Sequence, residues 1–499
     1  MFKLRPPIRV SPYLVRACRT LMALACVSAL APAVHAQTQV WGLTNLYIFQ
    51  GGISGPDGGT PTGGLIIGSD GNYYGTTWYG GTGGGTLFKV TPDGAESIVY
   101  AFSGSQDGQL PSKPIQGTDG NFYGTAYWGG GPNGYGIIYK VTPSGEETIL
   151  QSFTNSDGGP ANPGAGLTLG ADGNFYGTST GGGTSGQGTF FRMTPDGQLT
   201  VLYSFTGNAG VSPAAELVQI ENGEFFGTAR AGGDTGNGTI FKISTAGKIA
   251  VLHSFSGGSD GAYPAAPLMR GRDGAFYGTT QAGGTGACTP SGLPAGCGTV
   301  FRVTAAGEES VIYTFAGYPT DGSSPEGGLV QAKNGTLYGT TDAGGYSDAG
   351  NCSSGCGTIF SMTTAGTEQI IYSCGEPPQP WYYECWIPSY TLLLSADGTL
   401  TGTSENGGNG WGNVFAIAPV PTVTLSATPA AITLHKSTDL KWQSTDAQSC
   451  TASGAWSGTE AVKGSMREVP ATTGTVTYTL TCAGIGGTAS ASAMVTVTQ

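Results

Sequence analysis

The sequence predicts an all-β protein, a seven-bladed β-propeller closed by its N-terminal strand and followed by a small β-sandwich. Three observations lead to this prediction. A short aromatic phrase ending in Gly-Thr recurs seven times, and the residues between its copies divide into four strand patterns. Residues 422–499 then change to alternating Thr, Val and Leu. Tandem units of four strands, each about 50 residues long, are typical of propellers.

The repeated phrase sets the period of the chain. Its first copies read Asp-Gly-Asn-Tyr-Tyr-Gly-Thr at residues 70–76 and Asp-Gly-Asn-Phe-Tyr-Gly-Thr at residues 119–125. The glycines of the seven copies are Gly75, Gly124, Gly177, Gly227, Gly278, Gly339 and Gly402. Successive copies are 49 to 63 residues apart, so the later repeats carry insertions.

Each repeat divides into four short strands. A first apolar strand, as at residues 65–67, passes through an Asp-Gly or Asn-Gly turn into the aromatic second strand. A Gly-rich loop leads to the third strand, and a Pro-Asp-Gly or Ala-Gly turn leads to the fourth. The chain enters with a fourth-strand pattern at residues 46–49 and leaves with a third-strand pattern at residues 414–417. We therefore expect the N-terminal strand to complete the seventh blade, which removes exposed sheet edges.

These phrases resemble the secreted GloVer tandem-repeat proteins. The family pattern runs roughly Asp-Gly-Asn-Phe-Tyr-Gly-Thr, then Gly-Gly, then Gly-Thr-x-Phe-Lys-x-Thr-x-x-Gly, and the resemblance covers about residues 43–418. It implies an exported, propeller-like array and carries no activity. The fourth repeat departs from the pattern with Asn-Gly-Glu-Phe-Phe at residues 222–226, and the seventh has Thr401 in place of Tyr.

The two ends of the chain differ from the repeats. Residues 1–36 carry five cations, an apolar run and a Val-His-Ala cleavage site, which predicts a signal peptide. A membrane anchor is disfavoured by the short apolar run, and lipidation at Cys26 is the minor alternative. We expect the propeller over residues 37–418, a linker at 419–421 and the sandwich at 422–499. This last module resembles a bacterial immunoglobulin-like domain with Trp442 and Tyr478 in its core, although its Trp-Cys-Cys order departs from the antibody pattern.

Charge and location restrict the partners. Without residues 1–36 the chain has fifteen Lys and Arg against thirty-two Asp and Glu. Nucleic-acid affinity depends largely on cations that neutralise phosphates, so we expect no nucleic-acid partner. No transmembrane segment is expected in the mature chain. Secretion or the cell surface is the predicted location, with the periplasm as an alternative.

Eight cysteines remain after export, and an even number predicts disulfides. Their proximity in sequence favours the pairs Cys288–Cys297, Cys352–Cys356, Cys374–Cys385 and Cys450–Cys482. A zinc site is disfavoured because only His253 and His435 remain as imidazoles, so no metal or cofactor is predicted. The recurring Asp-Gly loops are interpreted as turns, and calcium binding by them is left open. Those loops contain Asp57, Asp107, Asp157, Asp260 and Asp321.

Candidate ligand-binding residues lie on the face that carries the long loops between strands two and three and between repeats. A position that lies one or two residues before Gly-Gly holds a different residue in each repeat. The seven residues are Trp78, Tyr127, Thr180, Arg230, Gln281, Asp342 and Glu405. This variation indicates either an exposed position without constraint or a ring of seven residues, one from each repeat, that binds a ligand. We call it the ring position. Aromatic residues gather in consecutive blades six, seven, one and two, and Tyr and Trp bind apolar sugar faces. They are Trp381, Tyr382, Tyr383, Trp386, Trp411, Trp78, Tyr79, Tyr127 and Trp128.

Two hypotheses for function follow, and a purely structural surface protein is a third. The first is an exported module that binds glycan or protein through Trp78, Tyr79, Tyr127, Trp128, Arg230, Gln281 and Trp411. The second is a glycoside hydrolase or polysaccharide lyase in which Asp342 and Glu405 are catalytic, because paired carboxylates can act as acid and base or nucleophile. A Ser-His-Asp hydrolase is disfavoured, because His253 and His435 lie away from this face.

Overall fold

The protein is built almost entirely from antiparallel β-strands. The computed structural model describes residues 39–52, 55–131, 133–156, 158–220, 223–290, 292–346, 352–375, 385–388 and 390–499. The predicted signal peptide lies outside these residues. Among them the only helical element is one turn of 3-10 helix, η1 (Gly258–Asp260). No helix within the described ranges is long and apolar enough to cross a membrane.

Seven antiparallel sheets repeat along residues 40–419 of the described chain. Their strands follow sequence order, except that β1 joins the last sheet beside β33. Sheet 1 contains β2 (Gly59–Ile67), β3 (Tyr73–Tyr79), β4 (Thr86–Val90) and β5 (Glu96–Ala101). Sheet 2 contains β6 (Gln109–Pro111), β7 (Ile115–Gln116), β8 (Phe122–Trp128), β9 (Ile137–Val141) and β10 (Glu147–Ser152). Sheet 3 contains β12 (Thr168–Leu169), β13 (Phe175–Ser179), β15 (Thr189–Met193) and β16 (Leu199–Ser204). Sheet 4 contains β17 (Val218–Gln219), β18 (Glu224–Ala229), β19 (Thr239–Ser244) and β20 (Ile249–Ser254).

The remaining sheets include the one that joins the two ends of the repeat array. Sheet 5 contains β21 (Met269–Arg270), β22 (Phe276–Thr280), β23 (Thr299–Val303) and β24 (Glu309–Thr314). Sheet 6 contains β26 (Val330–Gln331), β27 (Leu337–Thr341), β29 (Thr358–Met362) and β30 (Glu368–Ser373). Sheet 7 contains β31 (Leu393–Leu394), β32 (Leu400–Ser404), β33 (Asn413–Pro419) and β1 (Trp41–Ile48). Two small pairs, β11 (Pro160–Ala161) with β14 (Gly181–Gly182) and β25 (Gly322–Ser323) with β28 (Ala343–Gly344), lie outside the seven sheets. β1 therefore pairs with β33 across almost the whole repeat array, as the sequence predicted.

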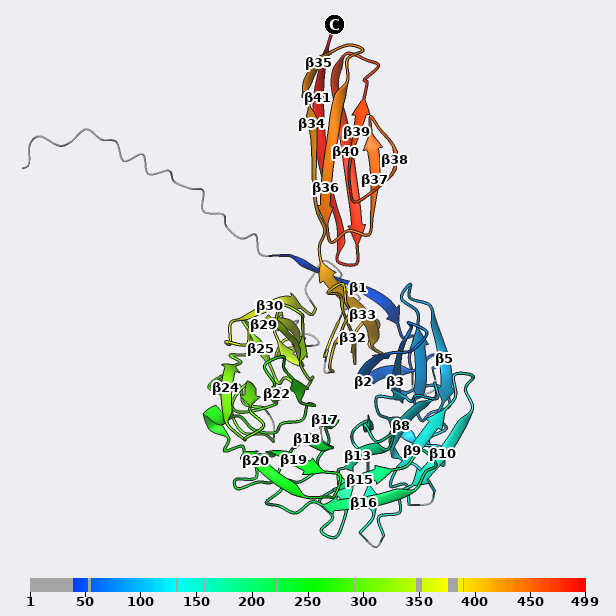
Figure 1. Cartoon of the computed structure of the whole chain (residues 1–499), viewed down its shortest axis with the longest axis vertical. Helices are drawn as coiled ribbons and strands as arrows, with labels where there is room; N and C mark the ends of the chain where they lie inside the picture. The colour runs from blue at the N-terminus through cyan, green and yellow to red at the C-terminus, as the bar shows by residue number, and fades with distance from the viewer. Residues whose placement is uncertain are drawn as a thin grey trace, which may run out of the picture. The chain divides into compact units, whose positions relative to one another are not determined.

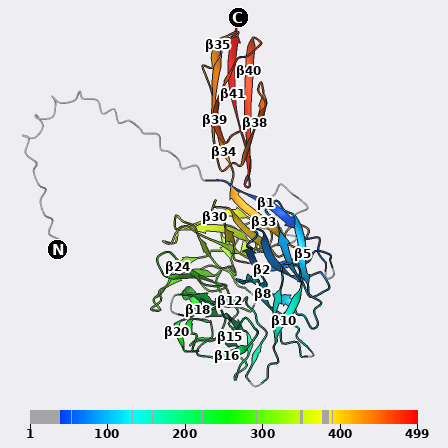
Figure 2. The same ribbon diagram turned by 45° about the vertical axis from the view of Figure 1, so that its right-hand side comes forward.

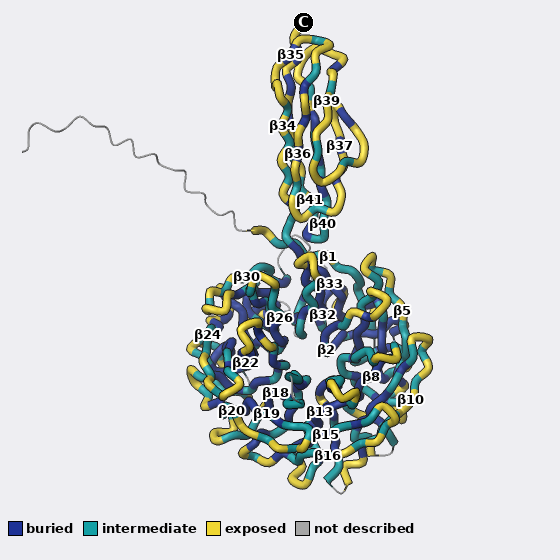
Figure 3. The backbone as a smooth tube through the Cα atoms, viewed as in Figure 1, coloured by how far each residue is buried: buried dark blue, intermediate teal, exposed yellow. Residues whose placement is uncertain are grey.

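Each sheet packs against the next through a separate core cluster, and sheet 7 packs against sheet 1. The paired aromatics of the second strand explain this. Successive residues of a strand point to opposite faces. Tyr123 therefore packs against Phe175 of sheet 3 with 4.4 Å between ring centroids, while Phe122 packs against Tyr74 of sheet 1 at 4.3 Å. Figures 1 and 2 show the sheets following one another in this order, and the buried residues of Figure 3 lie mostly within and between them.

The glycine of the Gly-Thr phrase makes room for an aromatic ring of the third strand. A Cβ atom on Gly278 would lie 2.5 Å from Cζ of Phe301, and one on Gly339 would lie 2.6 Å from Cζ of Phe360. The same relation recurs in all seven repeats. Packing therefore requires glycine at this position, because the side chain of any other residue would overlap the buried ring.

The threonine of the same phrase connects neighbouring sheets. Thr125 Oγ1 donates a hydrogen bond to the carbonyl oxygen of Ala165 at 2.8 Å, from sheet 2 to the first strand segment of repeat 3. Thr228 and Thr279 make the equivalent bonds to Ala266 and Gly327, at 3.2 and 3.3 Å. The accepting carbonyl groups do not pair with a neighbouring strand. The threonine hydroxyls supply the hydrogen-bond donors that buried backbone groups require.

The outer strands carry a recurring group of one hydroxyl and two carboxyls. Tyr313 on β24 donates to Asp321 at 2.8 Å, and Glu368 on the outer strand of sheet 6 lies beside both. Burial, and then the charge of Asp321, raises the pKa of Glu368 to about 7. Glu96 and Glu147 have the same raised pKa beside Asp57 and Asp107.

Residues 422–499 form two facing sheets. One contains β34 (Thr422–Thr428), β36 (Thr438–Thr445) and β39 (Lys463–Glu468). The other contains β35 (Ala431–Thr433), β41 (Gly487–Thr498), β40 (Gly474–Gly484), β37 (Ser449–Gly454) and β38 (Gly458–Glu460). Trp442 and Tyr478 are buried in the core between them, as expected, and Trp456 joins them.

The described cysteines form the four disulfides that their spacing predicted: Cys288–Cys297, Cys352–Cys356, Cys374–Cys385 and Cys450–Cys482. Cys450 on β37 and Cys482 on β40 lie directly opposite each other within one sheet. The antibody disulfide joins two sheets instead. The Trp-Cys-Cys order is thus accompanied by a disulfide within one sheet, with Trp442 on the facing sheet.

We expect Gly278→Ala to destabilise the protein by about 1–3 kcal/mol, because the added methyl group overlaps the ring of Phe301. Chemical denaturation of the mature chain measures this cost. Gly207→Ala is the matched control, since a Cβ there meets no atom within 4 Å and the φ angle is ordinary. Equal stability of the two variants would contradict the packing explanation.

Glu368→Gln tests the raised pKa. The native carboxyl has a pKa of about 7, against 4.5 for an ordinary Glu. Its contribution to stability is therefore fully present below about pH 4.5 and lost as pH rises through about 7. We expect the variant to gain about 1 kcal/mol over the native protein between pH 4.5 and pH 8, after allowance for solvent screening. A stability difference that is independent of pH in denaturation curves would refute this.

Candidate functional site

A cavity of about 400 Å³ lies where the first-strand segments of the seven repeats converge. Each repeat contributes one to four residues from the segment that begins at a proline and ends at the apolar first strand. The lining residues from these segments include Thr62, Gly63, Ser112, Lys113, Gly164, Gly166, Ala214, Glu216, Ala265, Glu326, Tyr390 and Thr391. The cavity is thus a property of the whole set of repeats.

Small residues allow the innermost segments to approach one another. A Cβ on Gly63 would lie 2.7 Å from the backbone nitrogen of Lys113, and one on Gly166 would lie 2.8 Å from Oε1 of Glu216. Gly328 is equally restricted, because its Cβ would lie 2.6 Å from the hydroxyl of Thr391. Glycine here permits backbone approach and leaves space between the segments.

In each repeat, the residue directly before the proline that begins the cavity-lining segment has a left-handed backbone, with φ between 54° and 61°. These seven residues, called here the pre-proline residues, are Thr60, Leu110, Asn162, Ser212, Tyr263, Ser324 and Ile387. Such a conformation is uncommon for residues other than glycine and costs on the order of 1–3 kcal/mol. Strain of this kind persists only where surrounding bonds impose it, and it often marks functional sites.

The hydrogen bonds of the pre-proline residues explain the conformation. The N–H of each one donates to a carbonyl of the preceding repeat, at 2.7 to 3.2 Å; Thr60 closes the series by donating to Trp411. The carbonyl oxygens of Ser212 and Tyr263 accept from the N–H groups of Arg230 and Gln281, at 3.4 and 3.1 Å. The pre-proline residue is therefore bonded both to the preceding repeat and to the variable ring position of its own repeat.

Arg230, Gln281 and Glu326 form a chain of polar contacts that ends at Glu326 in the cavity lining. Nη2 of Arg230 donates to Oε1 of Gln281 at 3.0 Å, and Nε2 of Gln281 donates to the carboxylate of Glu326. Burial raises the pKa of Glu326, although Arg230 and Gln281 favour its ionised form. The structure thus brings together two predicted ring residues and one carboxylate that the sequence analysis did not identify.

Tyr390 joins the same wall from the seventh repeat. Its hydroxyl donates to Oε1 of Glu405 at 3.0 Å. Burial, then the negative charges of Glu405, Asp342 and Glu326, hold the pKa of Tyr390 well above its usual range. Both predicted catalytic carboxylates therefore lie near one phenol, and that phenol lines the cavity.

Lys113 and Glu216 form an ion pair at 2.7 Å between repeats 2 and 4. The side chains are 19% and 22% exposed. The pair passes Gly166 of repeat 3, where a side chain would collide with Glu216. It balances the charge of the one lysine in the cavity lining.

The aromatic candidates divide into two groups. Trp78 and Tyr127 line the cavity and are half-buried. Trp128 stays exposed and contacts Tyr127 edge to face, with ring centroids 4.9 Å apart. Tyr79 is half-buried outside the cavity lining, and Trp411 packs against Gly51 in the core between sheets 7 and 1. Trp381, Tyr382 and Tyr383 lie outside the described residues.

The sequence analysis missed Lys113, Glu216, Glu326 and Tyr390. A signal for them was present: Pro, three variable residues and then Leu or Ile precede the second strand of every repeat, as in residues 61–65 and 111–115. Polar and aromatic residues vary inside that frame just as they vary at the ring position. The sequence analysis considered only the apolar end of this segment, as the first strand, and so did not identify its variable residues as candidates.

Comparisons with known proteins agree with the repeat pattern. A model of the Gloeobacter/Verrucomicrobia repeat matches residues 111–353. No curated protein matches the chain.

Two solved structures show a weak likeness. The extracellular domain of the putative hybrid two component system BT3049 from B. thetaiotaomicron is 10% identical, with a TM-score of 0.47 over 92% of this chain and 58% of that one. PorZ from Porphyromonas gingivalis, described as an essential bacterial surface component of the type-IX secretion system, is 13% identical, with a TM-score of 0.44 over 90% of this chain and 61% of that one. The chain thus spans about three fifths of each, and likeness at this level carries no argument about function.

Lys113→Met leaves Glu216 without its ion-pair partner, so we expect a loss of roughly 1–3 kcal/mol in the free energy of unfolding. Adding Glu216→Gln should recover part of that loss, because the remaining charge is removed. The matched control is Lys89→Met, which breaks a more exposed pair with Asp70 and should cost about 1 kcal/mol or less. Equal costs for the two lysines in urea titrations would disprove a special role of the inner pair.

Proposed function

We propose that this chain is an exported seven-bladed β-propeller that binds a neutral or weakly charged carbohydrate in its axial cavity. One observation carries the proposal: Trp78, Tyr127 and Tyr390, from three different repeats, line one cavity together with hydrogen-bonding groups. Aromatic rings cover the apolar faces of sugars, while their polar edges and neighbouring side chains meet the hydroxyl groups. A volume of about 400 Å³ is within the range of small-ligand sites.

The propeller assignment is supported by the cyclic order of contacts. The seven core clusters and the seven pre-proline hydrogen bonds both connect each sheet to the next and the last to the first. The pairing of β1 with β33 is the strand closure that a propeller ring needs.

Export is supported by the predicted signal peptide at residues 1–36 and by four disulfides among the described cysteines. Disulfides persist in oxidising compartments and are rare in the cytosol. The cell surface, the medium and the periplasm all provide such conditions. A role for the sandwich of residues 422–499 as a spacer or accessory module fits this setting.

Polysaccharide cleavage is the second candidate function, and the carboxyl groups around Tyr390 favour it. Glu326 has a raised pKa, as a general acid requires, while Glu405 accepts a hydrogen bond from the phenol. Asp342 adds a third negative charge beside them. This arrangement suits a glycoside hydrolase or lyase that acts on a chain end within the cavity.

The test of binding is gel retardation of the mature protein in a panel of plant and bacterial polysaccharides. For a retarding glycan we expect Trp78→Ala to weaken affinity roughly 10-fold, which corresponds to about 1.4 kcal/mol. Tyr127→Phe should weaken it less, because the ring remains. Tyr318→Ala, at a surface position that is 50% exposed and outside the cavity lining, is the control. Retention of full affinity by Trp78→Ala would exclude the axial cavity as the binding site.

The same incubations test cleavage through the release of reducing ends. If they appear, Glu326→Gln and Glu405→Gln should each abolish them while binding persists. Glycan cleavage that survives these two changes and Asp342→Asn would rule out these carboxylates as catalytic groups. Retardation without new reducing ends would establish a binding module.

A further inference from the structure

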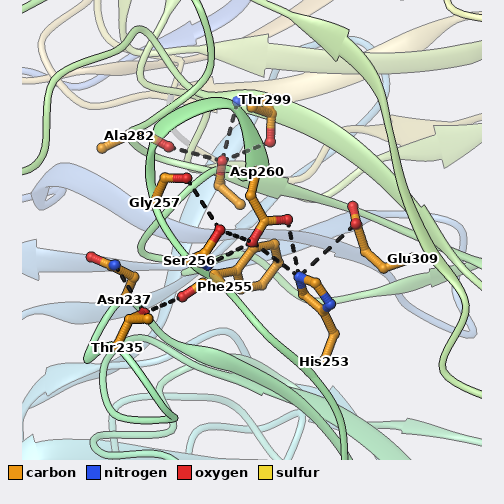
Figure 4. Close-up of polar contacts among 11 residues, drawn as sticks. Thr235, Asn237, His253, Phe255, Ser256, Gly257, Asp260, Ala282, Thr299 and Glu309 are labelled. Atoms are coloured by element: carbon orange, nitrogen blue, oxygen red, sulfur yellow. Dashed lines mark hydrogen bonds and ion pairs between the residues drawn. The ribbon is translucent and has the colours of Figure 1, made fainter.

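A group of three metal-ligating side chains lies on the outer edge of sheets 4 and 5, away from the cavity. His253 is on β20, Asp260 is in η1 and Glu309 is the first residue of β24. Nε2 of His253 is 3.1 Å from Oδ1 of Asp260 and 3.9 Å from Oε2 of Glu309. Figure 4 shows the aspartate and the glutamate pointing toward the imidazole from two sides.

The carboxylate of Glu309 is not satisfied by these contacts. Its side chain is 9% exposed, and its Oε1 is buried without a hydrogen-bond partner among the described residues, as are the Oε1 atoms of Glu96, Glu147 and Glu368 in other repeats. Within that part of the chain, His253, Asp260 and Glu309 are also the one group whose ligand atoms come close enough to hold a metal ion, all within 4.8 Å of one another. A carboxyl buried in this way needs a proton or a cation to balance its charge. What distinguishes Glu309 from the equivalent glutamates is the imidazole of His253, 3.9 Å from its Oε2.

The other repeats show what histidine changes at this position. Tyr occupies it in five of the six remaining repeats, as Tyr47, Tyr100, Tyr203, Tyr313 and Tyr372. Tyr100 and Tyr313 donate their hydroxyl protons to Asp107 and Asp321, and a glutamate lies beside each pair. A neutral phenol is a donor there, whereas a neutral imidazole nitrogen is a metal ligand. The fourth repeat therefore replaces a hydrogen-bond donor with a ligand and keeps both carboxylates.

We propose that His253, Asp260 and Glu309 bind a zinc ion that links sheets 4 and 5. Zinc combines imidazole with carboxylate ligands in tetrahedral geometry, and at bond lengths of about 2.0–2.1 Å neighbouring ligand atoms lie roughly 3.3 Å apart. The two distances of 3.1 and 3.9 Å fall on either side of that value. Calcium and magnesium prefer sites made only of oxygen, so the imidazole selects against them.

Neighbouring groups orient the aspartate for this role. The backbone N–H and the hydroxyl of Ser256 both donate to Oδ2 of Asp260, at 2.6 and 2.9 Å. The carboxylate then faces His253, with Oδ1 at 3.1 Å and Oδ2 at 3.3 Å from Nε2, and Oδ1 is the oxygen that accepts no bond from Ser256. His253 and Asp260 are 22% and 19% exposed, so an ion can enter from solvent and a water molecule can complete the coordination.

The test is zinc titration of EDTA-treated, dialysed mature protein, followed by calorimetry and metal analysis. We expect one zinc ion per chain and a rise of several degrees in the thermal midpoint, because the ion binds only the folded state. His253→Tyr restores the residue of the neighbouring repeats and should fold normally, but lose this site. Loss of a residue that only hydrogen-bonds to a metal ligand typically lowers metal affinity roughly 10- to 100-fold. Because His253 is itself a ligand, the zinc affinity of the variant should fall further.

Two further variants separate this site from other zinc binding. His435→Asn, in the C-terminal module, removes the other imidazole and should leave zinc affinity unchanged; Asn tolerates the positive φ of 67° at that position. Tyr313→His should create a second zinc equivalent with Asp321 and Glu368. No zinc binding by the native chain, or equal binding by His253→Tyr, would overturn the proposal.

Discussion

The repeat array depends on one backbone contact, the hydrogen bond that each pre-proline residue makes to the preceding repeat. Seven residues have the same left-handed φ, although none of them is glycine, and all seven N–H groups find a carbonyl of the neighbouring repeat. In repeats 6 and 7 that carbonyl belongs to Cys297 and Cys356, so disulfides brace the acceptor. The strain is balanced by fixed bonds on both sides of the residue.

This contact separates the scaffold from the site. The N–H of a pre-proline residue holds the neighbouring sheet, while its carbonyl holds the backbone of the variable ring position, as Ser212 does for Arg230. Both bonds join backbone atoms, and only the second one involves the ring position. Side chains there can change from Trp78 to Glu405 without altering how the sheets join. A repeat protein built in this way can vary its cavity wall while its fold stays constant.

Packing follows the distance from the centre of the array. The innermost segments use glycine and alanine because their backbones come within contact distance, as at Gly63 and Gly166. The second strands use paired aromatics, which fill the spaces between sheets on both faces. Four of the outermost strands place Tyr or His beside two carboxyls, where partial exposure lets a proton or a cation balance the charge.

The sequence by itself determined the repeat, the four strands of each unit, the pairing of the N-terminal strand with the last sheet, and the four disulfides. These follow from periodicity, turn residues and local cysteine spacing, which are properties of short stretches of chain. Only the tertiary structure decided which ring residues meet the cavity. Glu326 reaches Gln281 across 45 residues, Lys113 reaches Glu216 across 103, and Trp411 turns into the core. Such contacts depend on how the seven sheets converge. A local sequence pattern cannot show which residues so far apart in the chain come together.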